Sequence, residues 1–551
     1  MRIRYQVSDL DRVRLPRKGP AVVVANHPFG GVEGIVLADL LLKTRPDVKI
    51  MANYLLERIP EVRDHLIFVD PFGRKESAMK NLKGLRESID WLKNGNLLGI
   101  FPAGEVSHWH SKERSITDPE WGEPVAGLIR KARASVVPVY FQGRNSAWFH
   151  LLGLLHPMIR TALLSHELLN KMDSRIEIKI GQPIPFKKIE RFPNDRELID
   201  YLRQRTYLLG KRPSLIQNTV ERQQVKRKRN WKPLVVPTVK NFLLEEVRNL
   251  PDTQVLLEQE EFQVFWARAS QIPYVLREVG RLREITFREA GEGTGDSIDL
   301  DLFDSHYHHL ILWQKKTLEV VGAYRLGPTD LILSRYGKKG LYTTSLFKFH
   351  NDFFLQVHPA LELGRSFIRR EYQKAFSALM LLWKGIGQYV VRYPRYRFLY
   401  GPVSISDDYR RVSKTLLIKF LREQNYRPEL ARWVKAKHPY RRDLRKGWMD
   451  QAVVSMIRDA GEVSDWIAEL EADQKGIPIL LKQYLKLGGK LLGFNIDPQF
   501  SRVVDGLILV DLAKTNPVVL ERYLGKEGAD FFLGYHQTPD PADLPSRSVG
   551  A

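Results

Sequence analysis

A histidine and a glutamate lie close together near the N-terminus, in the segment NHPFGGVEG that runs from Asn26 to Gly34. This segment directly follows the apolar run AVVVA and opens a helical pattern. Gly30 and Gly31 permit close approach of the backbone to a substrate. At such a turn, His27 could take the proton of an acceptor hydroxyl, while Glu33 fixes the imidazole tautomer and offsets its charge. We therefore predict a general-base pair, worth roughly 10²–10⁴ in rate.

A second block, FPAGEVS over residues 101–107, ends another apolar run. Together the two blocks resemble those of the glycerolipid acyltransferase family, which carries a histidine followed by an Asp and later a Phe-Pro-Glu-Gly-Thr-Arg-Ser motif. The resemblance covers roughly residues 15–190 and implies that His27 is the general base. The family's Asp position is Val32 here. Glu33, one step later, is similar to the acidic residue of the hemolysin-like lysophospholipid acyltransferase branch and takes the role of acidic partner.

The second block keeps four of the seven residues of the family motif and differs at the other three. The resemblance assigns the kept residues to substrate binding: Phe101, Pro102, Gly104 and Ser107. Ala103 and Val106 stand where the family has Glu and Arg, and in the family that Arg is associated with the acceptor phosphate. Because a bidentate phosphate donor is lost, we predict that the acceptor is not a lysophosphatidate and that Glu105 faces a cationic amino-acid head group. Arg74, at the end of FVDPFGR, is a further substrate-contacting candidate.

Four groups of residues in the C-terminal half form a second constellation. In chain order they are Arg283 with Phe287, then Asp299, Asp301 and Asp304, then Arg325, and finally Glu362 with Arg365. Attack of an α-amine on a thioester needs a neutral amine, so a carboxylate must accept its proton, and Glu362 is our candidate base. The aspartates could bind the cationic end of an amino-acid acceptor. For the arginines two roles stay open, namely holding the acceptor carboxylate or forming structural ion pairs. The aspartates lack calcium-binding spacing, so we expect no metal.

In this order the four groups are similar to those of the acyl-homoserine-lactone synthases and, more closely, the ornithine-lipid N-acyltransferases, over roughly residues 255–500. The resemblance implies an N-acetyltransferase-like fold, an acyl-acyl carrier protein as donor and no bound cofactor. The chain lacks that superfamily's Gly-rich pyrophosphate loop, which argues against coenzyme A as the donor.

The order of the two halves resembles the bifunctional ornithine-lipid synthases of bacteria. The resemblance implies that the C-terminal site transfers a 3-hydroxyacyl chain to the α-amine of ornithine, and that the N-terminal site then esterifies the 3-hydroxyl. Lysine, glycine and glutamine stay open as acceptors. Three alternatives also remain: a quorum-signal synthase, a lysophospholipid acyltransferase with an accessory domain, and a basic nucleic-acid- or membrane-binding protein without catalysis. A nucleic-acid partner explains the charge but neither motif set, so we expect none.

Alternating apolar runs and helical patterns must position the first site. The predicted strands are Ala21–Ala25, Leu97–Phe101, Val136–Phe141 and Ile176–Ile180. The predicted helices are Val32–Lys43, Ser77–Lys93 and Ala126–Ala132. This alternation indicates an α/β domain of the glycerolipid-acyltransferase type over residues 1–215.

The second site requires a second α/β domain, N-acetyltransferase-like, over residues 250–535. Its predicted helices are Ile272–Phe287, Arg369–Leu382 and Lys414–Arg422, and its strands His309–Gln314 and Leu318–Arg325. A basic linker is expected over 216–249 and a disordered tail over 536–551.

Composition restricts the partners and the compartment. The 551 residues carry a formal charge of +22 and no cysteine, which excludes disulfides and cysteine nucleophiles and fits a reducing cytoplasm. The charge favours acidic acyl carrier protein and an anionic membrane as partners. The longest apolar stretch, 145–159, is shorter than the ~20 residues of a membrane span. Continued to 169, it predicts either interfacial or core helices, so we expect a peripheral protein at the inner face of the cell membrane.

Overall fold

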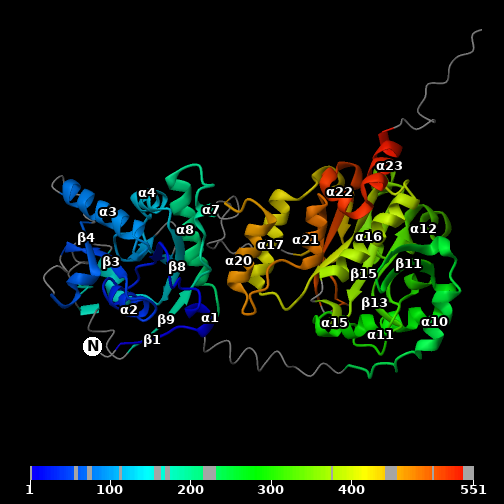
Figure 1. Cartoon of the computed structure of the whole chain (residues 1–551), viewed down its shortest axis with the longest axis horizontal. Helices are drawn as coiled ribbons and strands as arrows, with labels where there is room; N and C mark the ends of the chain where they lie inside the picture. Colours follow the sequence, from blue (N-terminus) through cyan, green and yellow to red (C-terminus); the bar gives the residue numbers. More distant parts are fainter. Residues whose placement is uncertain are drawn as a thin grey trace, which may run out of the picture. The chain divides into compact units, whose positions relative to one another are not determined.

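The computed structural model describes residues 3–54, 60–70, 77–110, 115–153, 163–164, 166–167, 174–214, 231–373, 376–440, 456–498, 500 and 502–537 (Figure 1). The chain forms two compact units, Met1–Lys226 with Ser464–Gly476, and Arg227–Val463 with Ile477–Ala551. Both combine a sheet with helices, which confirms the predicted α/β class. Throughout these described ranges, each helix is too short or too polar to span a bilayer.

The first unit is built on a seven-stranded sheet of order β1-β9-β8-β2-β5-β3-β4. Its strands are β1 (Arg4–Gln6), β2 (Ala21–Ala25), β3 (Val48–Asn53), β4 (Leu66–Val69), β5 (Leu97–Ile100), β8 (Ser135–Gln142) and β9 (Arg175–Ile180). From β8 to β4 all neighbours are parallel, and β9 runs antiparallel to β8. All five residues of β2 are buried, because helices cover both faces of the sheet.

Helices of the first unit pack on the two faces of this sheet. α2 (Val32–Leu42) buries its apolar residues against alternate residues of β2. α3 (Ser77–Lys93), α4 (Glu123–Ala132) and α8 (Asp195–Leu209) lie together on the other face (Figure 1). Shorter elements complete the unit: α1 (Asp9–Arg12), the hairpin β6 (His108–His110) and β7 (Ser115–Thr117), α5 (Ala147–Gly153) and α7 (Phe186–Ile189).

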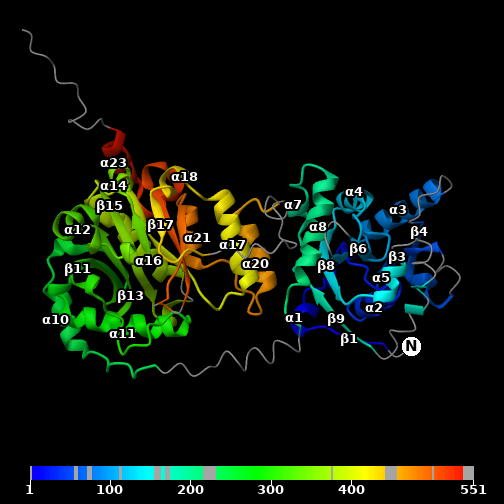
Figure 2. The same ribbon diagram turned by 180° about the vertical axis from the view of Figure 1, so that it is seen from behind.

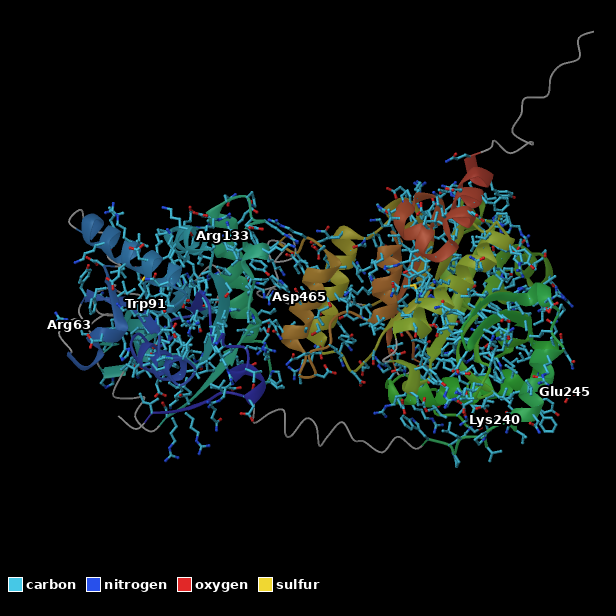
Figure 3. All side chains as sticks on the ribbon, viewed as in Figure 1. Arg63, Trp91, Arg133, Lys240, Glu245 and Asp465 are labelled. Atoms are coloured by element: carbon cyan, nitrogen blue, oxygen red, sulfur yellow. The ribbon has the colours of Figure 1, made fainter. Side chains whose placement is uncertain are left out.

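The segment Ser464–Gly476 belongs to the first unit although it lies far along the chain. It includes the end of α20 (Ala460–Leu470), whose Asp465, labelled in Figure 3, pairs with Lys188 at 3.2 Å. The fully buried carboxylate of Glu469 accepts from Arg205 at 2.9 Å and also pairs with the guanidiniums of Arg14 and Arg212. Burial disfavours this charge, but the three arginines outweigh it and lower the pKa of Glu469. No pattern in the sequence predicted this insertion.

The second unit has an eight-stranded sheet of order β10-β11-β12-β13-β15-β16-β19-β18. Its strands are β10 (Val255–Gln259), β11 (Phe262–Arg268), β12 (His308–Gln314), β13 (Glu319–Pro328), β15 (Ala360–Ile368), β16 (Phe398–Ile405), β18 (Lys490–Ile496) and β19 (Val504–Asp511). Neighbours are antiparallel except β15 and β16, which pair in parallel from Ala360–Glu362 to Phe398–Tyr400. On its other edge β15 pairs with β13 from Leu361 to Ile368, and β16 pairs with β19 from Phe398 to Ile405.

Two long helices, α11 (Pro273–Glu289) and α16 (Phe376–Arg392), cover opposite faces of this sheet (Figure 2). Further helices of this unit are α12 (Thr329–Tyr336), α13 (Thr343–Leu346), α14 (Asn351–Val357), α17 (Arg411–Gln424), α18 (Pro428–Ala431), α21 (Ile479–Lys486), α22 (Pro517–Leu524) and α23 (Lys526–Gln537). A two-stranded sheet pairs β14 (Phe347–Phe349) with β17 (Val434–Ala436).

Most predicted elements form within three residues of their expected ends, and two regions differ. The helix predicted over Arg369–Leu382 is two helices, α15 (Arg370–Gln373) and α16, and α16 continues to Arg392. Inside the expected linker, Lys240–Arg248 form α10, because Leu243 is buried against the core of the second unit and Phe242 stacks on Tyr274 at 4.8 Å. Residues 538–551 of the expected tail lie outside the described residues.

Candidate active sites

The first site lies where two parallel strands of the first unit end. β2 and β5 pair in register, with Val24 opposite Ile100, so the residues that follow them emerge at the same edge of the sheet. The rings of His27 and Phe101 accordingly lie with their centroids 4.7 Å apart. The Asn26 side chain exchanges two hydrogen bonds with the backbone of Phe141 on β8, at 3.1 and 2.7 Å, which fixes the start of the loop.

His27 and Glu33 form the predicted pair. His27 Nδ1 lies 2.8 Å from Glu33 Oε1, and the His27 side chain is 16% exposed whereas Glu33 is fully buried. The Glu33 carboxylate also accepts the backbone N–H groups of Phe29, Gly30 and Gly31 at 2.9, 2.9 and 3.2 Å. Gly30 has a φ of +97°, which only glycine adopts readily, and this turn aims the three N–H groups at one carboxylate.

The charges of this pair support each other. Burial alone would favour the neutral imidazole, but the Glu33 carboxylate outweighs it and raises the pKa of His27. Burial likewise opposes ionisation of Glu33, but His27 and the loop N–H groups lower the pKa of this carboxyl. Since Nδ1 faces Glu33, the other ring nitrogen, Nε2, is left to take a proton from a substrate hydroxyl.

Asp118, which the sequence did not single out, ties the two motif blocks together. Its Oδ1 accepts the backbone N–H of His27 at 3.1 Å and the hydroxyl of Ser107 at 2.5 Å, and its Oδ2 accepts the Trp121 indole at 3.0 Å. The Ser107 N–H donates in turn to the His27 carbonyl at 2.8 Å. Ser107 is buried, so in this structure it positions the loop. Asp118 had no sequence signal, because a lone Asp-Pro step commonly marks a turn.

The other residues predicted for this site differ in their exposure to solvent. Pro102 is buried, Gly104 is exposed with a φ of +66°, and Glu105 is exposed. Arg74 lies outside the described residues. The structure therefore brings together His27, Glu33, Phe101 and Ser107, and head-group binding by Glu105 stays a prediction.

The second site centres on Glu362, near the start of β15 where that strand pairs with β16. Its side chain accepts the Tyr307 hydroxyl at 2.9 Å, the Thr343 N–H at 2.7 Å and the Tyr400 hydroxyl at 3.4 Å. Tyr400 stands directly opposite Glu362 in the parallel register. Burial raises the pKa of Glu362 to about 7, against the opposing effect of the hydrogen bonds from Thr343 and Tyr307. A carboxyl of this kind can accept an amine proton near neutral pH.

The predicted aspartates and arginines form a buried ion-pair network beside Glu362. Arg283 donates to both oxygens of Asp304 at 2.9 Å, and its Nε lies 3.2 Å from Asp299. Arg325 pairs with Asp301 at 2.6 Å. Burial raises the pKa of Asp304, but the two arginines outweigh it and hold that pKa far below its usual range. Of the two roles left open for the arginines, the geometry shows ion pairs for Arg283 and Arg325.

Arg365 differs from the other two arginines. Its distances to Asp299 and Asp301 are longer, 3.7 and 3.5 Å, and its side chain is 12% exposed. It lies within the register shift between β13 and β15, directly after Gly364, and has a φ of +48°, a left-handed conformation that is uncommon outside glycine. Its guanidinium packs against the rings of Tyr342 and Phe500, at 5.2 and 4.8 Å. Arg365 is thus the arginine of this group that is least committed to ion pairing.

Several residues around this site escaped sequence analysis. They are Tyr307, Tyr342, Thr343, Tyr400, Glu292 and Asp505. Phe287, which the sequence did predict, has its ring centroid 5.3 Å from that of Phe500. Burial raises the pKa of Glu292 to about 7, although the Ser404 hydroxyl donates to it at 2.9 Å. These residues come from segments that meet only in the folded sheet, so no local spacing could reveal them.

Comparisons with known proteins match both units of the chain. Residues 2–215 match the family model described as Acyltransferase, and residues 282–384 match the Acetyltransferase (GNAT) domain. The glycine N(alpha)-acyltransferase of Bacteroides thetaiotaomicron is 38% identical over 305 residues, covering 52% of this chain and 86% of the relative. The glycine N(alpha)-acyltransferase of Phocaeicola vulgatus is 36% identical over 160 residues, covering 27% of this chain and 49% of the relative. The lyso-glycine lipid O-acyltransferase of P. vulgatus is 26% identical over 202 residues, covering 35% of this chain and 70% of the relative.

Two domains of acyltransferase families therefore occupy one polypeptide. Relatives of both kinds, N-acyl and O-acyl transferring, align with the same chain. The chain is an acyltransferase, and it belongs to the family that includes the glycine N(alpha)-acyltransferase of Bacteroides thetaiotaomicron.

Proposed function

We propose that the chain makes a diacylated amino-acid lipid in two steps, one at each site. The observation that carries this proposal is the presence of two separate general-base constellations, His27 with Glu33 in one unit and Glu362 in the other. The two bases suit different nucleophiles, a hydroxyl for the imidazole and an amine for the carboxylate.

In the first step, the amine of the acceptor attacks the carbonyl carbon of a 3-hydroxyacyl thioester. The C–N bond forms, the C–S bond breaks, and the sulfur leaves as a thiolate on its carrier, to be protonated by the proton that Glu362 takes from the amine. Glu362 takes the proton of the attacking amine, directly or through one water, because a carboxyl with a pKa of about 7 is substantially ionised at neutral pH.

In the second step, the 3-hydroxyl of the lyso-lipid attacks a second acyl thioester. His27 Nε2 accepts the hydroxyl proton, the ester C–O bond forms, and the C–S bond of the donor breaks. The sulfur leaves as a thiolate on its carrier and is protonated by the imidazolium. The ionised Glu33, held by three backbone N–H groups, stabilises the imidazolium that results.

The acceptor of the first step is an α-amino acid, for which glycine is the first candidate and ornithine the second. The names of the relatives favour glycine. The ion pairs favour it too, because Asp299, Asp301 and Asp304 would bind the side-chain ammonium of ornithine but already pair with arginines. Ornithine is supported by the resemblance of the whole chain to ornithine-lipid synthases. Arg365 is our candidate for holding the acceptor carboxylate.

The acyl donor is an acyl-acyl carrier protein, with a coenzyme A thioester as the less favoured source. An acidic carrier suits a chain with a charge of +22, and so does peripheral contact with an anionic membrane, where the lyso-lipid intermediate would reside. Neither step requires a bound cofactor.

Expression in a bacterial host that lacks amino-acid lipids, followed by lipid mass spectrometry, tests this function. The unaltered chain should yield a diacylated amino-acid lipid, and its head-group mass separates glycine from ornithine. His27→Ala should accumulate the monoacylated intermediate, whereas Glu362→Gln should abolish both lipids. His350→Ala, at a mostly exposed histidine, is the matched control and should leave both steps intact. Absence of any new lipid, with the protein folded and expressed, would refute the proposal.

A further inference from the structure

Three large apolar side chains stand exposed on neighbouring elements of the first unit. Trp148 and Leu151 on α5 are 71% and 57% exposed, and Trp109 on β6 is 38% exposed. α5 contacts β6, and Figure 2 shows the two elements beside each other. We call these three residues the tryptophan patch. Exposed tryptophans that gather in this way commonly mark a binding surface.

The tryptophan patch adjoins the His27 site through two short links. β6 begins one residue after Ser107, whose N–H donates to the His27 carbonyl. α5 begins two residues after Asn145, a buried residue whose side chain donates to the Phe29 carbonyl at 3.4 Å. Both elements that carry the patch therefore extend from residues bonded to the catalytic loop.

The outward position of these side chains is fixed by the fold. On α5, Phe149 and His150 are buried, which turns Trp148 and Leu151 outward. The Ser146 N–H, just before α5, donates to the buried carboxylate of Glu167 at 3.1 Å, which anchors the start of the helix. The short helix thus has one face in the core and one apolar face toward solvent.

We propose that the tryptophan patch docks on the interface of a bilayer containing anionic phospholipid, with the His27 site next to the leaflet from which the lyso-lipid enters. Indole rings prefer the headgroup region of bilayers, and a short amphipathic helix lies in that plane. The charge of +22 suits an anionic surface, and Arg144, three residues before α5 begins, is exposed. The inference rests on the proposed function in one respect, namely that the acceptor at His27 is an amphiphile.

Site-directed labelling tests this docking directly, because the chain contains no cysteine. The full-length variant Trp148→Cys would carry an environment-sensitive fluorophore and be mixed with vesicles of phosphatidylcholine and phosphatidylglycerol. We expect a blue shift and stronger emission with these vesicles and little change with phosphatidylcholine alone. The matched control is Leu355→Cys on α14, where the native leucine is 81% exposed. It should show no shift. Equal shifts at both positions, or none at Trp148→Cys, would overturn the proposal.

Vesicle flotation provides a second measurement. Trp148→Ser with Leu151→Ser should weaken partitioning to the anionic vesicles by about tenfold or more, since two apolar side chains lose their burial in the interface. Leu355→Ser should partition like the unaltered chain. A blue shift that grows with protein concentration in the absence of vesicles would instead identify a second copy as the occupant and overturn the proposal. No acyl donor is present, so this result is separate from the lipid analysis of the proposed function.

Discussion

At the scale of single residues, the pKa values of the two proposed bases, His27 and Glu362, are raised by different causes. His27 is held by an ionised neighbour, Glu33, which overcomes the effect of burial on the imidazole. Glu362, by contrast, accepts hydrogen bonds from the neutral Tyr307 hydroxyl and Thr343 N–H, and burial raises its pKa to about 7. The two steps should therefore respond differently to the loss of a neighbouring group.

Glu33→Gln removes the charge that favours protonated His27. Without that charge burial dominates, so the pKa of His27 should fall and O-acylation should slow by about 10²–10⁴-fold, the range for positioned base catalysis. N-acylation should be unchanged. The imidazole titration followed by NMR, together with the rate on a lyso-lipid, checks this. The control is Glu105→Gln, at an exposed carboxylate in the neighbouring motif, for which the imidazole titration should stay in place.

Tyr307→Phe removes a hydrogen bond that favours ionised Glu362. Since Glu362 must be ionised to act as a base, the N-acylation rate should fall as the pH drops below about 7 in the unaltered chain. In the variant the pKa of Glu362 should rise, so the acidic limb of the pH–rate profile, where the N-acylation rate falls, should move to higher pH. The measurement is the pH dependence of the N-acylation rate. Tyr336→Phe, at a tyrosine that is 44% exposed, should leave the profile in place. A uniform loss of rate without movement of the limb would contradict this assignment.

At the scale of elements, the sequence predicted the strands and helices that carry His27, Phe101 and Arg283 because their apolar periodicity is strong. β2 is buried on both faces, and α11 has one apolar stripe. Apolar periodicity does not reveal which strands pair with one another. Tyr400 reaches Glu362 only because β15 and β16 lie in parallel register, and Asp118 reaches Ser107 only once the β6–β7 hairpin has formed. The sequence therefore indicated the central residues of each site, but not the residues from other segments that hold them in place.

The junction of β15 and β16 is sensitive to side-chain size. A Cβ added at Gly401 on β16 would collide with the backbone carbonyl of Leu363, the residue after Glu362. Gly401→Ala should therefore separate the strands, lower stability by about 1–3 kcal/mol and reduce N-acylation while O-acylation persists. Gly364→Ala is the matched control, since its Cβ would meet nothing within 4 Å. Thermal unfolding and the two separate activities measure this difference.

At the scale of the whole molecule, the segment Ser464–Gly476 makes the first unit depend on residues far along the chain. Glu469→Gln would leave Arg14, Arg205 and Arg212 buried without their shared carboxylate. Breaking a buried charge cluster of this kind should cost about 3–5 kcal/mol. Hydrogen exchange should show the loss in β9 and α8 of the first unit. Asp465→Asn, whose carboxylate is 60% exposed, should change stability by at most about 1 kcal/mol.

This insertion also has a consequence for gene architecture. A reading frame that ends at Lys226 would encode every residue of the His27 site. Its product would lack Glu469, the carboxylate with which Arg14, Arg205 and Arg212 pair. The complementary product would carry α20 with its buried surface uncovered. A split at Lys226 should therefore destabilise the first unit, because Ser464–Gly476 would be encoded on the other product. A working split would have to transplant the codons for residues 464–476 into the first frame.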